Sequence, residues 1–335
     1  MQYEEADRSI WDYAIKDFPE ANFLQSWQWG EVHEEIGEKV IRRMLYIDGE
    51  PAGLLMGIVK NARRGRYLEV PGGPLIDWQN KLVVEMTTTE LQRIARLEKC
   101  VFVRMRPQLM ETPENSAILK SQGFIKAQMH LNAEHTNVID LTPDLDTLLT
   151  NMRQQTRYEV RRAEKRGVKV SWSSGVDAVE SFHQLQSSTA SRQQFIPPSR
   201  QYLLACHNRL DDSLRVYRAE KDGRLLNLAL IVSYGHEADY FEAASTDEAR
   251  KEPGAYGIIW QAMSDAKDSG VERFNLWGIA SNDDPNHRYA GVTTFKRGFG
   301  GDDVSYVAAH DLVIDKIRYG ANWLVETARK KRRRL

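Results

Sequence analysis

Basic side chains recur at a helical spacing in the middle of the chain. Each lies four residues from the next, at Arg153, Arg157, Arg161 and Lys165, with Arg162 and Arg166 beside them. On a helix this spacing gathers them on one face. Arginine binds phosphate oxygens through paired hydrogen bonds, so one interpretation is a phosphate-binding surface for a nucleotide or an RNA backbone. The other interpretation is a solvated face that Glu159 and Glu164 partly neutralise.

A lysine among aromatic residues is the second candidate for chemistry. Lys296 lies in the run from Phe295 to Phe299, after a loop rich in Asn and Asp at 281–286. An ammonium group held in this way can stabilise the negative charge that develops on an acyl oxygen. The same pattern also fits a lysine whose stem packs on apolar neighbours. The Pro-Gly-Gly-Pro turn at 71–74 permits close backbone approach to a ligand, or simply ends a strand.

The motifs of several large enzyme classes are missing from the sequence. It contains no Gly-x-Ser-x-Gly elbow, His-Glu-x-x-His pair, Walker loop or Gly-x-Gly-x-x-Gly fingerprint. The eight histidines show no metal-ligand spacing, and two cysteines, Cys100 and Cys206, cannot build a four-ligand zinc site. We therefore expect no structural metal.

Charge and hydropathy limit the partners and the cellular location that the chain can have. The 46 Lys and Arg nearly balance the 47 Asp and Glu, giving a net charge of −1. This excludes nucleic-acid binding driven by bulk charge but leaves room for a local basic patch. No apolar stretch approaches the roughly 18 residues of a membrane span, and the acidic N-terminus is unlike a signal peptide. These features favour a soluble cytoplasmic protein.

The basic residues belong to one long predicted helix, from about Pro143 to Arg166. Thr142 is a natural N-cap, and Pro143 suits the first helical position. Gly167 is a good residue to end the helix, and a strand is expected to restart at 168–172. A mostly apolar face is supplied by Leu145, Leu148, Leu149, Met152 and Val160.

Two stretches of the sequence share one order of predicted elements. In the first, strands and a helix are expected at 40–47, 52–59, 67–70, 80–97 and 101–103. In the second, they are expected at 214–219, 225–234, 240–243, 257–267 and 274–277. The two Asp-Gly hairpin turns, at 48 and 222, lie 174 residues apart. The 335 residues are therefore predicted to form two tandem domains of one α/β architecture.

The constellation of helix, lysine and repeat resembles the FemABX family of aminoacyl-tRNA-dependent peptidyl transferases, which add amino acids to the stem peptide of peptidoglycan precursors. Residues 151–170 are similar to the basic helix that opens the second domain of that family. Thr294–Phe299 resembles its Phe-Lys element, and residues 240–245 and the helix after Tyr256 add support. The resemblance covers most of the chain.

For the fold, the resemblance implies two tandem GNAT-like (N-acetyltransferase-like) domains of the α/β (α+β) class. The expected domains are 1–141, which would bind the acceptor, and 142–310, with a C-terminal helix within 311–335 that returns to the first domain. No room exists between Trp172 and Leu225 for the helical arm of larger members, so this is a compact form.

For the chemistry, the resemblance implies an aminoacyl ester on tRNA as donor, already activated, so that no cofactor or metal is needed. An amine of the acceptor attacks the ester carbonyl, and Lys296, positioned by Phe295, would stabilise the oxyanion. The four residues of the basic face would contact phosphates of the tRNA or the acceptor. Substrate-binding roles are implied for Tyr202, His33, Glu242, Tyr256 and Arg106.

Some residues depart from the pattern of the family. Pro198 stands where the best-matched members have an acceptor-binding Arg, and Glu242 where one has Tyr. Arg106 replaces an Asp of some members, and His33 replaces a Lys used for phosphate contact. These differences bear on the identity of the acceptor more than on the type of reaction.

Other functions stay open at this point. One is an acyl-CoA-dependent N-acyltransferase of the same fold, for which residues 251–257 are the nearest match to a pyrophosphate-binding loop. Another is a non-catalytic RNA-binding protein that uses the basic face and the Lys/Arg tail at 329–334. The precursor itself is either UDP-linked or lipid-linked. A lipid-linked precursor would bring the protein to the inner face of the plasma membrane, where the tail is attracted to anionic lipid.

Overall fold

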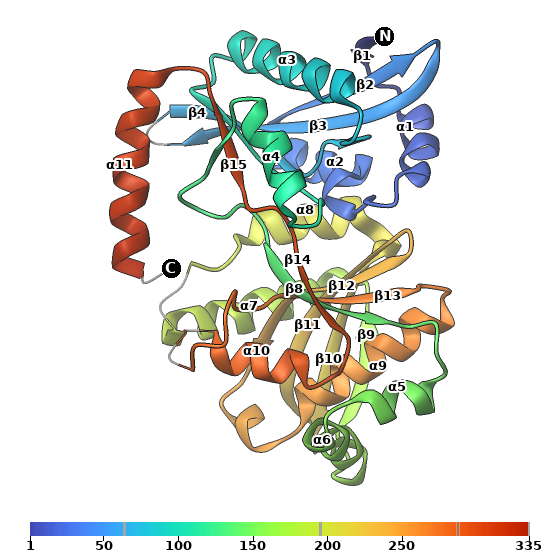
Figure 1. Ribbon diagram of the computed structural model, residues 1–335. Helices are drawn as coiled ribbons and strands as arrows, with labels where there is room; N and C mark the ends of the chain where they lie inside the picture. The colour runs from blue at the N-terminus through green and yellow to red at the C-terminus, as the bar shows by residue number, and fades with distance from the viewer. Residues whose placement is uncertain (63–64, 194–195, 286, 288, 334–335) are drawn as a thin grey trace. The chain divides into compact units, whose positions relative to one another are not determined.

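The computed structural model describes residues 1–62, 65–193, 196–285, 287 and 289–333. They form two compact units (Figure 1). Unit 1 comprises Met1–Glu134 and Ser305–Leu335, and unit 2 comprises His135–Val304. The last two residues of the chain, 334 and 335, lie outside the described residues, so the expectation for the basic tail is only partly covered.

Unit 1 is built on a mixed sheet in the order β1-β2-β3-β4-β6-β15-β7, with β5 paired to β3. Only β4 and β6 run parallel, and the other pairs are antiparallel. The strands are β1 (Gln2–Glu5), β2 (Lys39–Ile47), β3 (Glu50–Ala62), β4 (Gly65–Gly72), β5 (Leu75–Ile76), β6 (Phe102–Pro107), β7 (Ile125–Lys126) and β15 (His310–Val313). The helices are α1 (Arg8–Ala14), α2 (Trp27–Glu35), α3 (Lys81–Leu97), α4 (Pro113–Ser121) and α11 (Lys316–Arg333).

Local sequence signals explain how unit 1 forms its hairpin and its main helix. Asp48 and Gly49 both have positive φ, as the tight turn between β2 and β3 requires. Asn80 caps α3 by accepting a hydrogen bond from the Val83 amide. Helix α3 lies along the sheet (Figure 1). Leu91 and Ile94 on its apolar face belong to the core of unit 1. Both elements confirm the sequence predictions.

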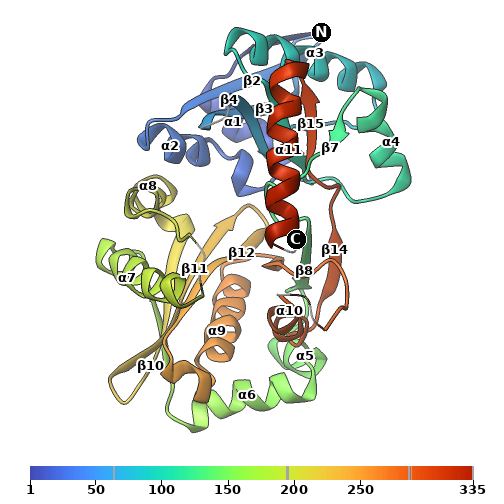
Figure 2. The same cartoon turned by 90° about the vertical axis from the view of Figure 1, so that its left-hand side faces the viewer.

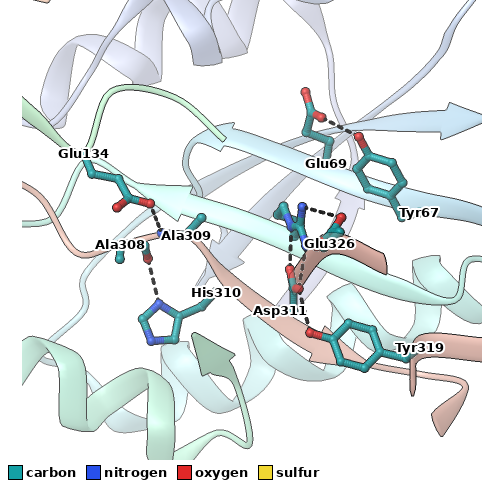
Figure 3. Close-up of polar contacts among 10 residues, drawn as sticks. Tyr67, Glu69, Glu134, Ala308, Ala309, His310, Asp311, Tyr319 and Glu326 are labelled. Carbon is teal, nitrogen blue, oxygen red and sulfur yellow. Dashed lines mark hydrogen bonds and ion pairs between the residues drawn. The ribbon is translucent and has the colours of Figure 1, made fainter. Parts of the chain in front are cut away.

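The C-terminal helix α11 is fastened to the sheet of unit 1 by a buried ion-pair network. The Arg104 guanidinium on β6 donates to both carboxylate oxygens of Asp311 on β15, each at 2.8 Å. It also pairs with Glu326 on α11 at 2.8 Å, and the hydroxyl of Tyr319 donates to Asp311 (Figure 3). The expected return of the C-terminal helix is confirmed. Residues 310–313, however, form a strand, so the helix begins at Lys316 rather than near Asp311.

Unit 2 repeats this sheet in the order β14-β8-β13-β12-β11-β10-β9. Its strands are β8 (His135–Asp140), β9 (Lys169–Ser173), β10 (Leu214–Lys221), β11 (Arg224–Tyr234), β12 (Glu237–Ser245), β13 (Arg273–Gly278) and β14 (Asp302–Ser305). Its helices are α5 (Leu145–Asn151), α6 (Gln154–Lys165), α7 (Val176–Gln193), α8 (Arg200–Leu210), α9 (Gly254–Asp268) and α10 (Ala290–Arg297). As in unit 1, one parallel pair, β12 with β13, lies among antiparallel neighbours.

β8 and β15 lie where the chain passes from one unit to the other. β8 follows the last strand of the first half but pairs with β13 in the second sheet. Conversely, β15 follows β14 but pairs with β6 and β7 in the first sheet. The chain therefore changes unit at 134/135 and 304/305, rather than at 141/142 and 310/311 as expected. Strand pairing, which the sequence did not reveal, sets these positions.

The sheet of unit 2 is covered on both faces. Figure 2 shows α9 on one side and α7 with α8 on the other. Ile231 on β11 joins the core that contains α9, whereas its buried neighbour Leu230 points to the opposite face. Burial on both faces explains the nearly continuous apolar run of β11.

The long helix predicted from Pro143 to Arg166 is two helices. Met152 and Arg153 have extended backbones with ψ of 150° and 141°, which breaks the helix between α5 and α6. Asp144, not Thr142, is the N-cap, and it accepts a hydrogen bond from the Thr147 amide. The break buries Met152 in the core of unit 2, a tertiary contact that overrides the helical propensity of the segment.

Candidate active site

The parallel strands of unit 2 separate in the middle of the sheet. β12 and β13 pair over three positions, ending at Asp239 opposite Asn275. Beyond them β12 stays with β11, whereas β13 stays with β8, so the two strands diverge. The equivalent strands of unit 1, β4 and β6, remain paired over five positions up to Gly72 and Pro107. Since ligands of α/β sheets bind at the carboxyl ends of strands, the divergence in unit 2 is the candidate active site.

Lys296 occupies this site. Its side chain extends from α10, and Nζ donates to the carbonyl oxygen of Gly278, at the end of β13, at 2.8 Å. Nζ also lies 6.0 Å from the centre of the Tyr240 ring on β12. The residue is only 8% exposed. Burial lowers the pKa of the Lys296 ammonium to about 8, and the charge of Glu242 opposes this shift.

A β-bulge turns Glu242 to the other face of the sheet. Tyr240 lies opposite Ile231 and packs on the α9 side, whereas Glu242 lies opposite Leu230, with Phe241 as the extra residue between them. Bulges re-aim side chains in this way. Without the bulge, Tyr240 and Glu242 would point to the same side. Tyr240 and Glu242, which both influence the Lys296 ammonium, therefore lie on opposite faces of the sheet.

The Glu242 carboxylate is held from α7. Nε2 of Gln186 donates to Oε2 of Glu242 at 2.8 Å. Burial raises the pKa of Glu242, while the Gln186 hydrogen bond and the Lys296 charge act to lower it. The sequence analysis missed Gln186 and the Gly278 carbonyl. Neither carries a motif, and only the folded chain brings them to Lys296 and Glu242.

A strained backbone precedes the Gly278 carbonyl. Trp277 has a φ of +59°, which is uncommon for a bulky residue. Its amide donates to Oδ1 of Asn275 at 2.8 Å, and its ring packs edge-on against Phe241 at 5.6 Å between centroids. These contacts hold the end of β13 in the conformation that presents the Gly278 carbonyl to Lys296.

Phe295 and Tyr256 form an aromatic cluster with Phe299. The Phe295 ring lies 4.9 Å from Tyr256 and 5.3 Å from Phe299, nearly edge-on to both. This cluster fixes α10, which carries Lys296, to α9, which carries Tyr256. Phe295 thus acts on the lysine through the helix, whereas the atoms next to the ammonium come from Gly278 and Tyr240.

The predicted basic face lies after the helix break, on α6 and its N-cap residue Arg153. Arg157 donates from Nη1 to the carbonyl oxygens of Thr150 and Met152, at 2.6 and 2.7 Å, and so caps the end of α5. Arg153, Arg161 and Lys165 are exposed. The Arg153 amide donates to the Gly298 carbonyl at 2.9 Å, which places the start of α6 beside the end of α10. A phosphate-binding role for these residues stays a prediction.

The remaining predicted substrate-binding residues are distributed over both units. Tyr202 is half-buried in the first turn of α8 in unit 2. In unit 1, His33 on α2 is buried with Nδ1 2.6 Å from Oε2 of Glu38. Arg106 on β6 is buried beside the Tyr306 ring at 5.1 Å, and its Nη1 donates to Oε1 of Gln108 at 2.8 Å. Their roles toward a substrate stay predictions.

Neither a metal-binding cluster nor a membrane-spanning helix occurs in the described part of the chain. Within those residues no group of three or more His, Cys, Asp or Glu is arranged to hold a metal ion. None of the helices described above is both long and apolar enough to cross a bilayer.

Known structures define the class of this fold. The crystal structure of FemX superposes with a TM-score of 0.86 at 18% identity, covering 97% of this chain and 100% of that one. A tandem GNAT protein from the clavulanic acid biosynthesis pathway superposes with a TM-score of 0.57 at 12% identity, covering 93% of this chain and 98% of that one. The fold is two tandem GNAT-like domains, as expected.

Sequence comparison defines the family. The FemAB family model matches residues 12–126, 115–220 and 203–327. The chain belongs to the FemAB family, which confirms the resemblance found in the sequence. One relative, the UDP-N-acetylmuramoylpentapeptide-lysine N(6)-alanyltransferase of Weissella viridescens, is 22% identical over 88% of this chain and 92% of its own length. The aminoacyltransferase FemB of Staphylococcus epidermidis is 30% identical, over 35% of this chain and 28% of its own length.

Proposed function

We propose that this protein is an aminoacyltransferase that moves an amino acid from aminoacyl-tRNA to an amine of the stem peptide of a peptidoglycan precursor. Its family and the names of its relatives support transfer of an amino acid to such a precursor. The observation that carries the proposal is the Lys296 ammonium, buried between the diverging strands of unit 2. Acyl transfer needs a positive group in a buried site, next to the carbonyl oxygen that becomes negative.

The reaction requires stabilisation of an oxyanion. When an amine attacks the ester carbonyl, the carbonyl oxygen becomes negative, and a preorganised ammonium in a site that excludes water lowers the energy of that state. With a pKa of about 8, Lys296 is still mostly protonated at neutral pH. Gly278 and Tyr240 would hold the ammonium in position before the substrate arrives.

The partners of the reaction follow from the same proposal. Arg153, Arg161 and Lys165 would bind phosphates of the tRNA backbone. Tyr202, Tyr256, His33 and Arg106 would contribute to binding of the precursor. These assignments rest on the family resemblance.

Contact with a membrane is part of the proposal if the precursor is lipid-linked. α11 exposes Ile317 and Leu324, at 89% and 65%, and carries basic residues at both ends. Such a helix can bind at the surface of an anionic bilayer. Sedimentation with phosphatidylglycerol vesicles tests this, and binding should weaken in Ile317→Ser/Leu324→Ser. Equal sedimentation of this variant and the wild type would count against α11.

A transfer assay tests the proposed function. Purified protein is incubated with alanyl-tRNA and with the lysine-containing UDP-N-acetylmuramoyl-pentapeptide, and products are identified by mass spectrometry. Seryl- and glycyl-tRNA and a lipid-linked precursor are further arms, and acetyl-CoA is the competing donor. A new amide on the stem peptide is expected only with charged tRNA. Transfer from acetyl-CoA alone would favour the acyl-CoA-dependent alternative.

A further inference from the structure

The Glu242 carboxylate has one oxygen held by the protein and one directed to no described partner. Gln186 donates to Oε2, and no hydrogen bond within the described residues involves Oε1. Glu242 is half-buried, so a ligand can reach it. The other amide atom of the buried Gln186, its Oε1, is also a hydrogen-bond acceptor without a partner in the described part of the chain. Unsatisfied acceptors on two side chains that are hydrogen-bonded to each other fit a ligand that brings N–H donors.

The position of Glu242 and Gln186 relative to Lys296 indicates which ligand the two acceptors can bind. Lys296 lies between the strands, with Tyr240 on the α9 face and Glu242 on the α7 face. If an acyl carbonyl lies against the ammonium, a nucleophile must approach that carbonyl from one of the two faces. The α9 side carries the Tyr240 ring, and the α7 side carries the acceptors. An amine approaching from the α7 side would meet Glu242 first.

We propose that Glu242 is a catalytic residue that binds the attacking amine as an ammonium ion and takes one of its protons, with Gln186 as the residue that positions the carboxylate. This inference rests on the proposed function and deepens it. An alkylammonium ion is not a nucleophile, because its nitrogen has no free electron pair. A base at this position would produce the reactive amine inside the site.

The protons balance in this step. The ammonium group starts with three, of which the Glu242 carboxylate takes one and passes it on to water. The free electron pair of the nitrogen forms the new C–N bond while the C=O electrons move to the oxygen beside Lys296. When the ester C–O bond breaks, a second proton goes from nitrogen to the leaving alcohol oxygen. The third stays on the amide.

The electrostatics of the site suit a base. The charged group that acts on Glu242 is Lys296 from α10, and Gln186 from α7, which donates a hydrogen bond to the carboxylate, is neutral. Burial raises the pKa of Glu242, which makes its carboxylate a better proton acceptor than an exposed one. The nearby Lys296 charge acts in the opposite direction and lowers the pKa of Glu242.

Glu242→Gln tests the inference, because it keeps the shape of the side chain and removes the base. With alanyl-tRNA and the lysine-containing precursor, kcat/KM at pH 7 should fall about 10²-fold or more. The residual rate should then increase about tenfold per pH unit between about pH 6 and 8, because only the free amine of lysine, with a pKa near 10.4, reacts. The wild type should show a much shallower slope over this range.

Glu237→Gln is the matched control. Glu237 is another buried carboxylate on β12, before the strands diverge, and it accepts a hydrogen bond from Asn275 at 3.1 Å. This variant should keep kcat/KM within threefold and the wild-type slope. Addition of formate to Glu242→Ala should restore part of the rate, which a purely structural role would not allow. Thermal unfolding checks that each variant is folded. If Glu242→Gln does not fold, Glu242→Asp, which keeps a carboxylate, and Glu242→Asn, which removes it, are compared instead.

The outcomes separate the two proposals. An active wild type with a Glu242→Gln variant that keeps its rate and pH slope would overturn the role of Glu242 and leave the aminoacyltransferase proposal intact. A wild type that forms no amide with any charged tRNA would overturn both. A slow Glu242→Gln variant with a tenfold slope supports both.

Discussion

The ammonium nitrogen of Lys296 donates a hydrogen bond to the carbonyl oxygen of Gly278 at 2.8 Å, between two strands that diverge. This contact joins α10 to the end of β13. It holds a cation in the interior of unit 2 at the place where the sheet is open.

Lys296→Ala should lower kcat/KM for transfer by about 10²-fold or more, because the oxyanion loses its positive partner. Lys267→Ala is the control. Lys267 is also a lysine of unit 2 that donates to a backbone carbonyl, that of Leu141 at 2.9 Å, but it lies at the end of α9. A transfer assay at pH 7 compares the two. A change below threefold in Lys296→Ala would remove this residue from the mechanism.

The rate should fall as pH rises through about 8, where the Lys296 ammonium loses its proton. Lys296→Arg, whose guanidinium stays protonated above pH 12, should be slower because its shape differs, but should lack this fall. The measurement is kcat/KM from pH 6 to 9.5 for both proteins. A wild-type rate that stays constant to pH 9.5 would contradict an ammonium role.

Lys296→Met should stabilise unit 2 near neutral pH. The folded-state pKa of about 8 lies below the ordinary value of 10.5, so the folded protein binds fewer protons than the unfolded chain between these values. The wild type therefore gains stability as pH rises from 8 to 10.5. A shift of this size corresponds to a burial cost on the order of 3 kcal/mol below pH 8.

Urea unfolding of Lys296→Met and wild type from pH 7 to 10.5 measures this difference. The stabilisation by Met should be largest at pH 7 and should shrink across this window. A difference that does not change with pH would show that burial does not lower the pKa of Lys296 in the folded protein.

Arg161→Ala and Lys165→Ala should each weaken tRNA binding and reduce the salt dependence of the binding constant by about one unit of slope, since each removes one phosphate contact. Arg157→Ala should instead lower stability by about 1 kcal/mol, because Arg157 caps α5. Filter binding between 50 and 200 mM salt and urea unfolding separate the two effects. If the salt dependence of tRNA binding is unchanged in both Arg161→Ala and Lys165→Ala, these residues do not form a phosphate-binding face.

Arg104→Met should destabilise unit 1 by about 3–5 kcal/mol, because it leaves the buried Asp311 without its partner. Arg104→Met/Asp311→Leu should lose less, since no buried charge is then uncompensated. Glu326→Gln, on the more exposed side of the network, should have the smallest effect. Urea unfolding followed by the fluorescence of Trp323 on α11 can follow the release of the helix. A double variant no more stable than Arg104→Met would contradict this account.

Local signals of the sequence determined much of the fold. The Asp-Gly turns at 48 and 222 fixed two hairpins because residues at both turn positions must adopt positive φ, which few types tolerate. Periodic apolar residues determined α3 and α9, whose faces pack on the sheets. The spacing of these elements revealed the duplication, and the motif around Lys296 indicated the family.

Only the tertiary structure decided how the strands pair and where the site lies. The pairing of β8 and β15, the divergence of β12 from β13, and the bulge at Phe241 depend on contacts between residues far apart in the sequence. The break at Met152 has the same origin, because burial of one side chain outweighs the helical preference of its neighbours. Gln186 and Gly278 carry no local signal, since their positions next to Glu242 and Lys296 exist only after the sheet has formed.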